Sequence, residues 1–580
     1  MARVRVRYGP GDEVAELAPV GGGWWRLDVP DAGPGTDYAF LLDDSDDPLP
    51  DPRARWLPHG VHGASRVYDH AVFAWTDHGW TGRQLPGAVL YELHIGTFTP
   101  DGTFDAAIER LDHLVDLGVD LVEVLPVNGF NGVHNWGYDG VAWYAVHEPY
   151  GGPDGLKRFV DACHARGLGV VLDVVHNHLG PSGNYLPRFG PYLKAGRNTW
   201  GDLLNLDGPD SDPVRRHILD NVAMWLRDYH VDALRLDAVH ALADTRATHL
   251  LEEMARETEA LSTHLGRPLS LIAESDLNDP RLVTAREAGG YGLHAAWDDD
   301  VHHALHAALT GERHGYYNDF GSLATLATAL EGAYVHAGTW SSFRGRVHGR
   351  PVDRVNVAGH RFVVFLQNHD QIGNRAVGDR ITATLGPDLL KVGALLLLTS
   401  PFTPMLFMGE EWGARTPWQF FTSHPEPELA AVTGRGRMEE FAAHGWAEVD
   451  VPHPQDPETF TRSKLDWSEL DRGPHADLLA FHRRLLALRK AVPDLSDPRL
   501  DRVRVRYDED ARWLVVGRQR HAVVANLADV PRTVPLDAAA DAVLLATDER
   551  VSLSPDAVEL PPRSAAVVRV KRPSNRALPD

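Results

Sequence analysis

From residue 89 onward the sequence alternates short apolar stretches of strand length with segments in which apolar residues recur at helical spacing. Such regular alternation over roughly 400 residues favours a closed (β/α)8 barrel, an α/β fold of the TIM-barrel class, over a doubly wound sheet. No Gly-x-Gly-x-x-Gly fingerprint and no P-loop follows an expected strand, which weakens nucleotide-binding alternatives. The eight expected strands are 89–93, 121–125, 170–175, 233–236, 269–273, 293–297, 361–366 and 404–408. The expected helices are 104–117, 156–166, 214–229, 248–265, 323–337, 389–399 and 476–492.

Both ends of the chain have a different pattern, in which apolar and polar residues alternate with period two between Pro, Gly and Asp clusters. Strands are expected at 3–8, 24–29, 38–42 and 67–75, and again at 502–507, 513–517, 522–526, 542–546 and 565–570. We therefore expect three domains: an N-terminal β-sandwich resembling a carbohydrate-binding module (1–84), the barrel (85–495) and a C-terminal β-sandwich (496–580). Two long loops, 179–212 and 310–359, interrupt the barrel, and loops of such length are usually functional or disordered.

Polar side chains follow four of the expected barrel strands at the point where each strand ends. The third strand runs into the segment 173–178, the fourth into Arg235 and Asp237, the fifth into Glu274, and the seventh into 367–374, which contains Asp370. Catalytic groups of a (β/α)8 barrel lie at the carboxyl ends of its strands. Structural ion pairs would explain one or two of these carboxylates, but three at corresponding strand ends predict an active site.

The residue types in these segments suit the hydrolysis of a glycosidic bond. That reaction needs one carboxylate near the anomeric carbon and one protonated carboxylic acid at the leaving oxygen. Arg235 lies two residues before Asp237 and would hold it ionised, whereas Glu274 follows an apolar strand and would need a raised pKa to keep its proton. His178 and His369 can donate hydrogen bonds to sugar hydroxyls.

Two other chemistries could use residues at the same strand ends. His176 and His178 form a His-x-His pair that could bind a metal, but barrel metallohydrolases mostly carry such a pair on the first strand, which here ends in 92–96. A Schiff-base mechanism needs a lysine, and none of the six lysines ends a barrel strand. We expect neither a metal nor a cofactor.

Charge and cysteine content restrict the partners. The formal net charge of −24 argues against nucleic acid and anionic membranes, whose phosphates would repel the chain. Cys163 is the single cysteine, so no internal disulfide and no thiolate metal cage is possible. The first residues contain no continuous apolar stretch like that of a signal peptide, and we expect a cytoplasmic protein. The sequence predicts no oligomeric state.

The four polar segments resemble the sequence regions of the α-amylase family of retaining α-glucan enzymes, in the same order. The resemblance implies that Asp237 is the nucleophile, Glu274 the acid/base and Asp370 the carboxylate that stabilises the transition state. It further implies that a −1 subsite binds the sugar ring to be attacked, with Tyr138 as its stacking platform. The other residues that the resemblance places at this subsite are His178, Arg235 and His369, and Asn368 is also expected to contact the substrate.

Further motifs resemble the branch of this family that releases trehalose from maltooligosyltrehalose. They include the segments 137–145, 150–153, 273–278, 368–375, 409–413 and 416–422. At His240 the chain departs from the broader amylase pattern, which puts an amylase-like acceptor site and its calcium ligand in doubt, although His240 itself is still expected to contact substrate. The alternatives are an α-glucan branching enzyme or a general α-amylase. A non-catalytic glucan-binding protein is disfavoured, because all three carboxylates are present.

The segment 297–303 after the sixth strand is the expected recognition surface for the trehalose unit. It carries an aromatic residue, three carboxylates and two histidines, and the alternative interpretation is the solvated acidic start of a helix. We expect hydrogen bonds to trehalose hydroxyls from this surface, from Gln371 and from the loop with Trp418, Phe420 and Phe421. The residues of this surface that are expected to bind the trehalose unit are Asp299, Asp300, His302 and His303.

Overall fold

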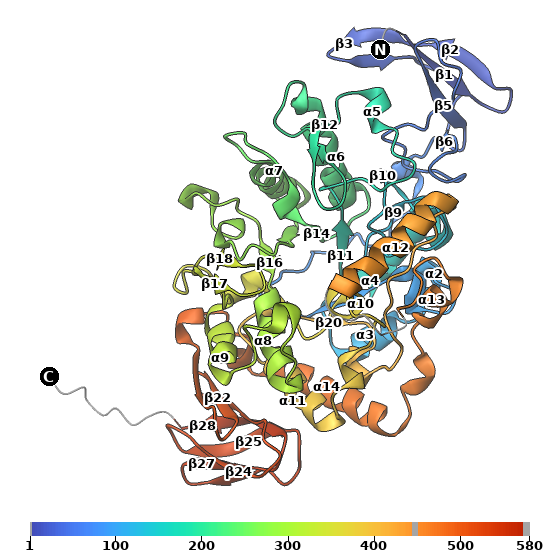
Figure 1. The fold of residues 1–580 in the computed structure, drawn as a ribbon. Helices are drawn as coiled ribbons and strands as arrows, with labels where there is room; N and C mark the ends of the chain where they lie inside the picture. Colours follow the sequence, from blue (N-terminus) through green and yellow to red (C-terminus); the bar gives the residue numbers. More distant parts are fainter. Residues whose placement is uncertain (1–2, 444–450, 572–580) are drawn as a thin grey trace.

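The computed structural model describes residues 3–443 and 451–571, and eight of its strands close into a parallel barrel (Figure 1). Around the barrel the strand order is β11-β14-β15-β16-β19-β20-β7-β8. All eight strands predicted from the sequence are present, with ends that differ by at most two residues from the prediction. Their bounds are β7 Leu90–Leu93, β8 Leu121–Val124, β11 Gly169–Val174, β14 Ala233–Leu236, β15 Ser270–Ala273, β16 Ala295–Trp297, β19 Phe362–Phe365 and β20 Thr403–Phe407.

Helices separate most of these strands and cover the outside of the barrel. Between β15 and β16 the chain makes only two 3-10 turns, Pro280–Leu282 and Arg286–Ala288. The single helix expected at 104–117 is instead two helices, because the chain turns at Glu109 and Arg110 and places the Arg110 guanidinium over Trp467. Besides α12, which is described below, the helices are α1 Ile95–Phe98, α2 Phe104–Ile108, α3 Leu111–Leu117, α4 Gly152–Ala165, α5 Leu186–Phe189, α6 Ser211–Asp228, α7 Leu250–Leu265, α8 Asp299–Thr310, α9 Leu323–Gly332, α10 His369–Gly373, α11 Pro387–Leu398, α13 Pro457–Arg462, α14 Gly473–Ala491 and α15 Pro493–Ser496.

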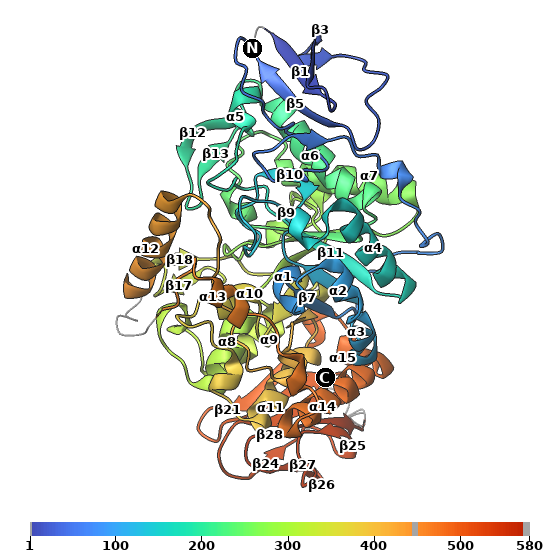
Figure 2. The same cartoon turned by 90° about the vertical axis from the view of Figure 1, so that its right-hand side faces the viewer.

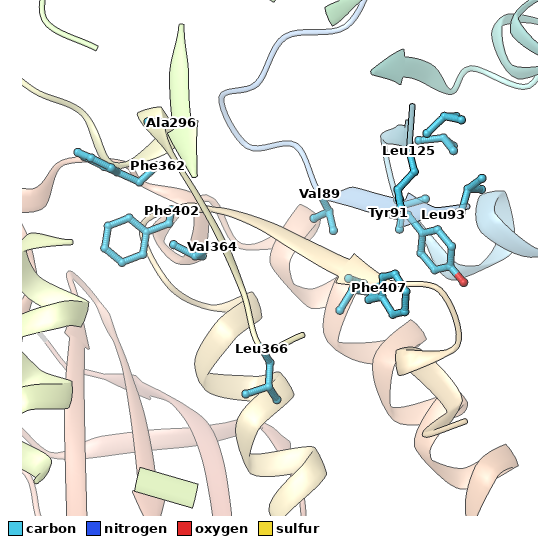
Figure 3. Close-up of a cluster of buried hydrophobic side chains, with 14 of the residues drawn as sticks. Val89, Tyr91, Leu93, Leu125, Ala296, Phe362, Val364, Leu366, Phe402 and Phe407 are labelled. Atoms are coloured by element: carbon cyan, nitrogen blue, oxygen red, sulfur yellow. The ribbon is translucent and has the colours of Figure 1, made fainter. Parts of the chain in front are cut away.

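Alternate residues of the barrel strands pack in two different cores. Phe362 and Val364 of β19 point outward into the large core between strands and helices, as Figure 3 shows together with residues from β7 and β20. Val363 and Phe365 belong to the smaller core inside the barrel. Side chains alternate across a strand, and both faces of a parallel sheet are covered, so these strands are apolar at nearly every position.

The N-terminal region forms one four-stranded sheet and a separate hairpin. The sheet order is β2-β1-β5-β6, and the hairpin pairs β3 with β4. Their common core also takes Tyr185 and Phe189 from the long loop after β11. The bounds are β1 Val4–Tyr8, β2 Glu13–Glu16, β3 Ala18–Gly21, β4 Trp24–Arg26, β5 Asp37–Leu42 and β6 Ser65–Arg66.

The strand predicted at 67–75 is wrong. This segment contains the 3-10 helix His70–Val72, which Asp69 caps by accepting a hydrogen bond from the backbone of Ala71. Two aromatic residues of this segment contact Lys157, a buried lysine of α4. The Lys157 ammonium lies 5.4 Å from the centre of the Phe73 ring and 5.8 Å from the centre of the Trp75 ring. Cation–π contacts with a helix therefore replace the sheet pairing that the period-two pattern predicted.

The C-terminal region packs a five-stranded sheet on a three-stranded sheet, at the end of the molecule opposite the N-terminal sheet (Figure 1). Val524 and Val568 fill the core between the two sheets, whereas Val523 and Val567 pack against the barrel helices. Residues 572–580 of the expected domain lie outside the described residues. The strands are β21 Arg504–Asp508, β22 Trp513–Arg518, β23 His521–Asn526, β24 Arg532–Pro535, β25 Ala540–Ala546, β26 Ser552–Ser554, β27 Ala557–Leu560 and β28 Ser564–Val570.

Three insertions stand on the same side of the barrel (Figure 2). The hairpin of β12 (Leu193–Arg197) and β13 (Asp202–Leu204) belongs to the long loop after β11, and the hairpin of β17 (Thr339–Ser341) and β18 (Arg346–His348) to the loop before β19. Helix α12 (Pro427–Ala443) follows β20. These insertions lie above the carboxyl ends of the barrel strands, where the sequence predicts the active site.

Candidate active site

Arg235 is the centre of the site, and its guanidinium is completely buried. Its Nη1 atom donates to Asp237 Oδ1 at 2.7 Å and to both carboxylate oxygens of Asp173 at 2.9 and 3.0 Å. A buried charge that loses its partner costs about 3–5 kcal/mol, so this arginine stabilises the protein only while its carboxylates are present. The ring of Trp297 lies 4.3 Å from the guanidinium and covers its other side.

The carboxylate of Asp237 is held at both oxygens. Asn177 donates from Nδ2 to Asp237 Oδ2 at 2.7 Å, while Arg235 occupies Oδ1. Asn177 also donates to the Asp237 carbonyl at 3.0 Å, which fixes the backbone together with the side chain. A carboxylate held in this way has one orientation, as a nucleophile requires.

Glu274 lies next to Asp237 and is coupled to it through the same arginine. Its Oε2 accepts a hydrogen bond from the backbone N–H of Ala238 at 2.6 Å and lies 3.6 Å from Arg235 Nη2. Ala238 adopts a left-handed conformation (φ 40°), which costs an alanine about 1 kcal/mol and aims this N–H at Glu274. The turn that carries Asp237 therefore also holds the Glu274 carboxylate.

Burial raises the pKa of Glu274 to about 8; the charges of Asp237, Asp370 and Asp299 add to this rise, and the charge of Arg235 opposes it. Glu274 therefore holds its proton at neutral pH. A neutral carboxylic acid beside a fixed carboxylate is the arrangement that an acid-assisted glycosidase needs.

His369 lies between Asp370, the third carboxylate, and the buried Glu92 of β7. Its Nδ1 bonds to Glu92 Oε1 at 2.6 Å, and its Nε2 lies 2.8 Å from the Tyr138 hydroxyl and 3.5 Å from Asp370 Oδ2. Burial lowers the pKa of His369, but the negative charges of Asp370 and Glu92 outweigh it and raise the pKa to about 9. His369 is thus a buried cation that faces Asp370.

Tyr138 lies flat against His369, with ring centroids 5.2 Å apart at an angle of 21°, and its hydroxyl donates to Asp173 at 2.5 Å. His178 packs between two loops, because its Nδ1 contacts Asn177 Oδ1 at 2.7 Å and its Nε2 contacts the Tyr138 carbonyl at 2.9 Å. Asn368 caps α10 by accepting a hydrogen bond from the backbone N–H of Gln371 at 2.7 Å. The structure thus brings these predicted site residues to the same rim as the carboxylates.

The predicted acidic surface is the first turn of α8, and its members divide into two groups. Asp299 accepts a hydrogen bond from Gln371 Nε2 at 3.1 Å, and burial together with the charges of Asp370 and Asp300 raises its pKa to about 7. His303 lies beside Asp299 and Asp300 in a small pocket, and its buried Nδ1 has no hydrogen-bond partner in the described part of the protein. Asp299 and Gln371 therefore lie near the carboxylates, and His303 lines a pocket with Asp299.

Two other members of this surface have structural partners. Asp300 Oδ2 accepts hydrogen bonds from Asn278 Nδ2 and from the backbone N–H groups of Val335 and His336, and so it anchors the loop before β17. His302 bonds to the Leu366 carbonyl and to the Tyr317 hydroxyl, both at 2.9 Å. The expectation that His302 binds substrate is corrected, because both of its ring nitrogens are used inside the protein.

The aromatic loop after β20 also differs from the expectation. Trp418 and Phe421 are completely buried, and Trp418 stacks on Trp136 with centroids 5.4 Å apart. Only Phe420 is partly accessible. His240 lies at the other edge of the site, where its Nε2 is 3.9 Å from Asp276 Oδ1 and its ring approaches Trp200 edge-on.

The sequence assigned no individual role to Asn177, Asp173 or Glu92, although the first two lie in the polar segment 173–178. All three lie in or next to barrel strands that were predicted, and each holds a residue that was predicted: Asn177 holds Asp237, Asp173 holds Arg235, and Glu92 holds His369. The only signal in the sequence was a polar residue at or near the carboxyl end of an apolar strand, which does not reveal its partner.

We predict that exhaustive chelation will leave the activity unchanged. His176 donates or accepts at Nε2 with Asn221 at 2.8 Å, and the two nitrogens of His178 are occupied, so this pair does not point at a common ligand. Among residues 3–443 and 451–571 no group of three or more His, Cys, Asp or Glu side chains is placed to hold an ion. Activity that is lost in chelator and restored by zinc or calcium would contradict this prediction.

Two family models match the chain: the α-amylase catalytic domain over residues 70–189, and a domain of unknown function, DUF3459, over residues 498–567. With the barrel and its paired carboxylates, they define the class of the protein as a glycoside hydrolase of the α-amylase family. A malto-oligosyltrehalose trehalohydrolase from Rhizobium sp. (strain M-11) is 58% identical, and the match covers 97% of this chain and 92% of the Rhizobium protein. A malto-oligosyltrehalose trehalohydrolase from Arthrobacter ramosus is 63% identical, and the match covers 85% of this chain and 86% of the Arthrobacter protein. The chain therefore belongs to the malto-oligosyltrehalose trehalohydrolases.

Among solved structures, a Salmonella typhimurium protein assigned to the α-amylases is similar over nearly the whole chain. It is 39% identical with a TM-score of 0.90, and the match covers 98% of this chain and 96% of the Salmonella chain. Within the described residues no helix has the length and apolar character needed to cross a membrane.

Proposed function

We propose that the chain hydrolyses the α-1,4 bond next to the terminal trehalose unit of maltooligosyltrehalose and releases trehalose, with retention of configuration. The observation that carries this proposal is the pair formed by Asp237, fixed at both oxygens, and Glu274, whose pKa is raised to about 8. One guanidinium contacts both carboxylates, which supports the separation of about 5–5.5 Å that retaining glycosidases need.

In the first step, Asp237 Oδ attacks the anomeric carbon while Glu274 gives its proton to the glycosidic oxygen. The bond to the trehalose oxygen breaks, a glycosyl–Asp237 ester forms, and trehalose leaves as a neutral alcohol. In the second step, Glu274, now a carboxylate, takes a proton from water, whose oxygen attacks the same carbon and displaces Asp237. Two inversions at one carbon give net retention.

The groups around the pair suit a positively charged transition state. Asp370 faces the site with a 42% exposed side chain, so it can approach the sugar ring as positive charge develops there. Tyr138, packed flat on the His369 cation, is the proposed stacking platform, and Asn368 and Arg235 are proposed to bind the sugar at the −1 subsite. His178 would support this subsite by holding Tyr138, because its two ring nitrogens contact Asn177 and the Tyr138 carbonyl.

The proposed acceptor side lies around Asp299, to which Gln371 is hydrogen-bonded and which lines a small pocket with His303. Gln371 Oε1 and His303 Nδ1 are buried and have no partner in the described residues, so sugar hydroxyls could satisfy both atoms. His240, beside Asp276 across the site, is placed to contact the same unit, whereas Asp300 would support the pocket through the loop that it anchors.

The substrate is tested by comparing maltooligosyltrehalose with a maltooligosaccharide of equal length. A site whose polar groups pair with the hydroxyls of the correct substrate rejects an analogue that leaves those groups unpaired. Such a site can discriminate between the two substrates by about 10⁴-fold. We expect kcat/KM to be at least about 100-fold higher for maltooligosyltrehalose, with free trehalose as the product. Gln371→Ala should lower kcat/KM for maltooligosyltrehalose more than it lowers kcat/KM for the maltooligosaccharide.

Product analysis distinguishes the alternatives. New α-1,6 branch points would indicate a branching enzyme, and equal cleavage of the two substrates would indicate a general α-amylase. Either result would contradict the proposed specificity while leaving the roles of Asp237 and Glu274 open to the tests described below.

A further inference from the structure

Helix α12 reaches the active site from a distant part of the chain. It follows β20, stands on the same side of the barrel as the β17–β18 hairpin (Figure 2), and is fastened at its start by Glu426. The Glu426 carboxylate accepts hydrogen bonds from Ser182 Oγ at 2.5 Å and from Asn131 Nδ2 at 2.9 Å, which belong to loops after β11 and β8. The helix therefore has a fixed starting point on the opposite part of the rim.

Arg437 is the residue of α12 that contacts the catalytic region. Its guanidinium is buried, although Arg435 and Met438 beside it in the sequence are exposed. Nη1 donates to Asn374 Oδ1 at 3.3 Å, Nη2 donates to the Gly373 carbonyl at 2.5 Å, and the guanidinium carbon lies 4.9 Å from the Phe420 ring. A buried arginine between exposed neighbours on the same helix indicates a specific contact.

Asn374 links this arginine to the third carboxylate of the site. Its Nδ2 donates to Asp370 Oδ1 at 3.2 Å, and its backbone N–H donates to the Asp370 carbonyl at 2.9 Å. An arginine can only donate hydrogen bonds, so Arg437 requires the oxygen of the Asn374 amide to face it. The NH2 group must then face Asp370, and the arginine thereby selects the amide orientation that the carboxylate needs.

The end of α10 is also fixed on its other side. A Cβ atom at Gly373 would lie 2.0 Å from Cη2 of Trp136, so the backbone there packs directly on the indole. The Gly373 carbonyl is in turn held by Arg437. The turn that carries Asp370 and Asn374 is thus fixed between Trp136 and α12.

We propose that Arg437 is a positioning residue for catalysis, which holds the Asp370 carboxylate in place through Asn374. This inference rests on the proposed function, in which Asp370 stabilises the charge of the transition state. An interaction that matters in the transition state rather than in the bound substrate changes kcat and leaves KM nearly unchanged.

The first test is Arg437→Ala with steady-state kinetics on maltooligosyltrehalose. We expect kcat to fall about 10- to 100-fold, the range for a misplaced catalytic group, and KM to change less than about two-fold. Arg435→Ala is the matched control, because it removes the same charge from an exposed position of the same helix, and it should retain wild-type kcat. An unchanged kcat in Arg437→Ala, or an equal loss in both variants, would overturn the proposal.

A double-mutant cycle with Asn374→Ala tests the link to Asp370. If Arg437 acts through Asn374, the double variant should be no slower than the slower single variant, within about two-fold. Fully additive losses would show that Arg437 acts by another route and would overturn the proposal. Thermal unfolding of all variants by circular dichroism identifies a loss that comes from misfolding, and Arg437→Lys, which keeps the charge but lacks the fork geometry, provides a second variant if Arg437→Ala does not fold. We expect Arg437→Lys to lose kcat as well, and wild-type kcat in this variant would overturn the proposal.

Asp370→Asn separates this inference from the function on which it rests. If Asp370→Asn is inactive while Arg437→Ala is fully active, only the positioning role is wrong. If Asp370→Asn is fully active, the role assigned to Asp370 in the proposed function is wrong.

Discussion

Asp237→Asn should reduce kcat by about 10⁴-fold or more, because an amide cannot form the glycosyl ester through which the reaction proceeds. The fold should persist, since the amide has nearly the shape of the carboxylate. It offers one acceptor where the carboxylate offers two, so either Arg235 or Asn177 loses its partner, and the free energy of unfolding should fall by about 1–3 kcal/mol. Turnover of maltooligosyltrehalose and thermal unfolding measure the two effects.

Asp237→Ala, assayed with added azide and an α-glycosyl fluoride, provides the stereochemical control. Azide can occupy the space that the carboxylate leaves and attack the anomeric carbon once, which gives a β-glycosyl azide and releases fluoride. An α-configured azide from this variant, or near-wild-type hydrolysis by Asp237→Asn, would show that another residue is the nucleophile.

Glu274→Gln should lower kcat on maltooligosyltrehalose by several orders of magnitude and leave substrate affinity largely intact. The amide has no proton to give, and a sugar alkoxide is a poor leaving group without protonation. Fluoride leaves without protonation, so an α-glycosyl fluoride should still glycosylate Asp237 in this variant. A fluoride substrate that reacts no faster than maltooligosyltrehalose would contradict the acid role.

The pH dependence gives an independent check on Glu274. Its pKa is raised to about 8, so the acid is protonated at neutral pH and loses its proton above pH 8. For the wild type, kcat/KM on maltooligosyltrehalose should therefore fall about ten-fold per pH unit on the alkaline side, above pH 8. Glu274→Gln with the fluoride substrate should lack this alkaline decrease. A decrease that remains at the same pH would assign it to another group.

Local sequence patterns determined the architecture because barrel strands carry their own signal. A strand covered on both faces is apolar at nearly every position, and the turn that follows it is polar, so each of the eight strands could be predicted to within two residues. The same rule predicted Asp237, Glu274 and Asp370, since catalytic groups lie where the apolar strands end. These properties depend only on neighbours in the sequence.

The orientation of side chains on α8 could not be predicted in this way. Every residue from Asp300 to Leu309 is buried, so the helix has no exposed polar face to indicate which residues point toward the site. His302 and His303 are adjacent in the sequence, yet His302 is bonded inside the protein while His303 faces the pocket with Asp299.

Contacts between distant segments were decided by the tertiary structure alone. Trp418 is buried against Trp136, and the segment 67–75 packs on Lys157 instead of pairing in a sheet. Arg437 contacts Asn374, which lies 63 residues earlier in the chain. The raised pKa of Glu274 has the same origin, since it depends on burial and on three carboxylates that follow other barrel strands. The sequence by itself determined which strands form the barrel and which residues end them, because those signals are local. Their partners, burial and protonation were decided only by the tertiary structure, because these depend on atoms that folding brings together from distant parts of the chain.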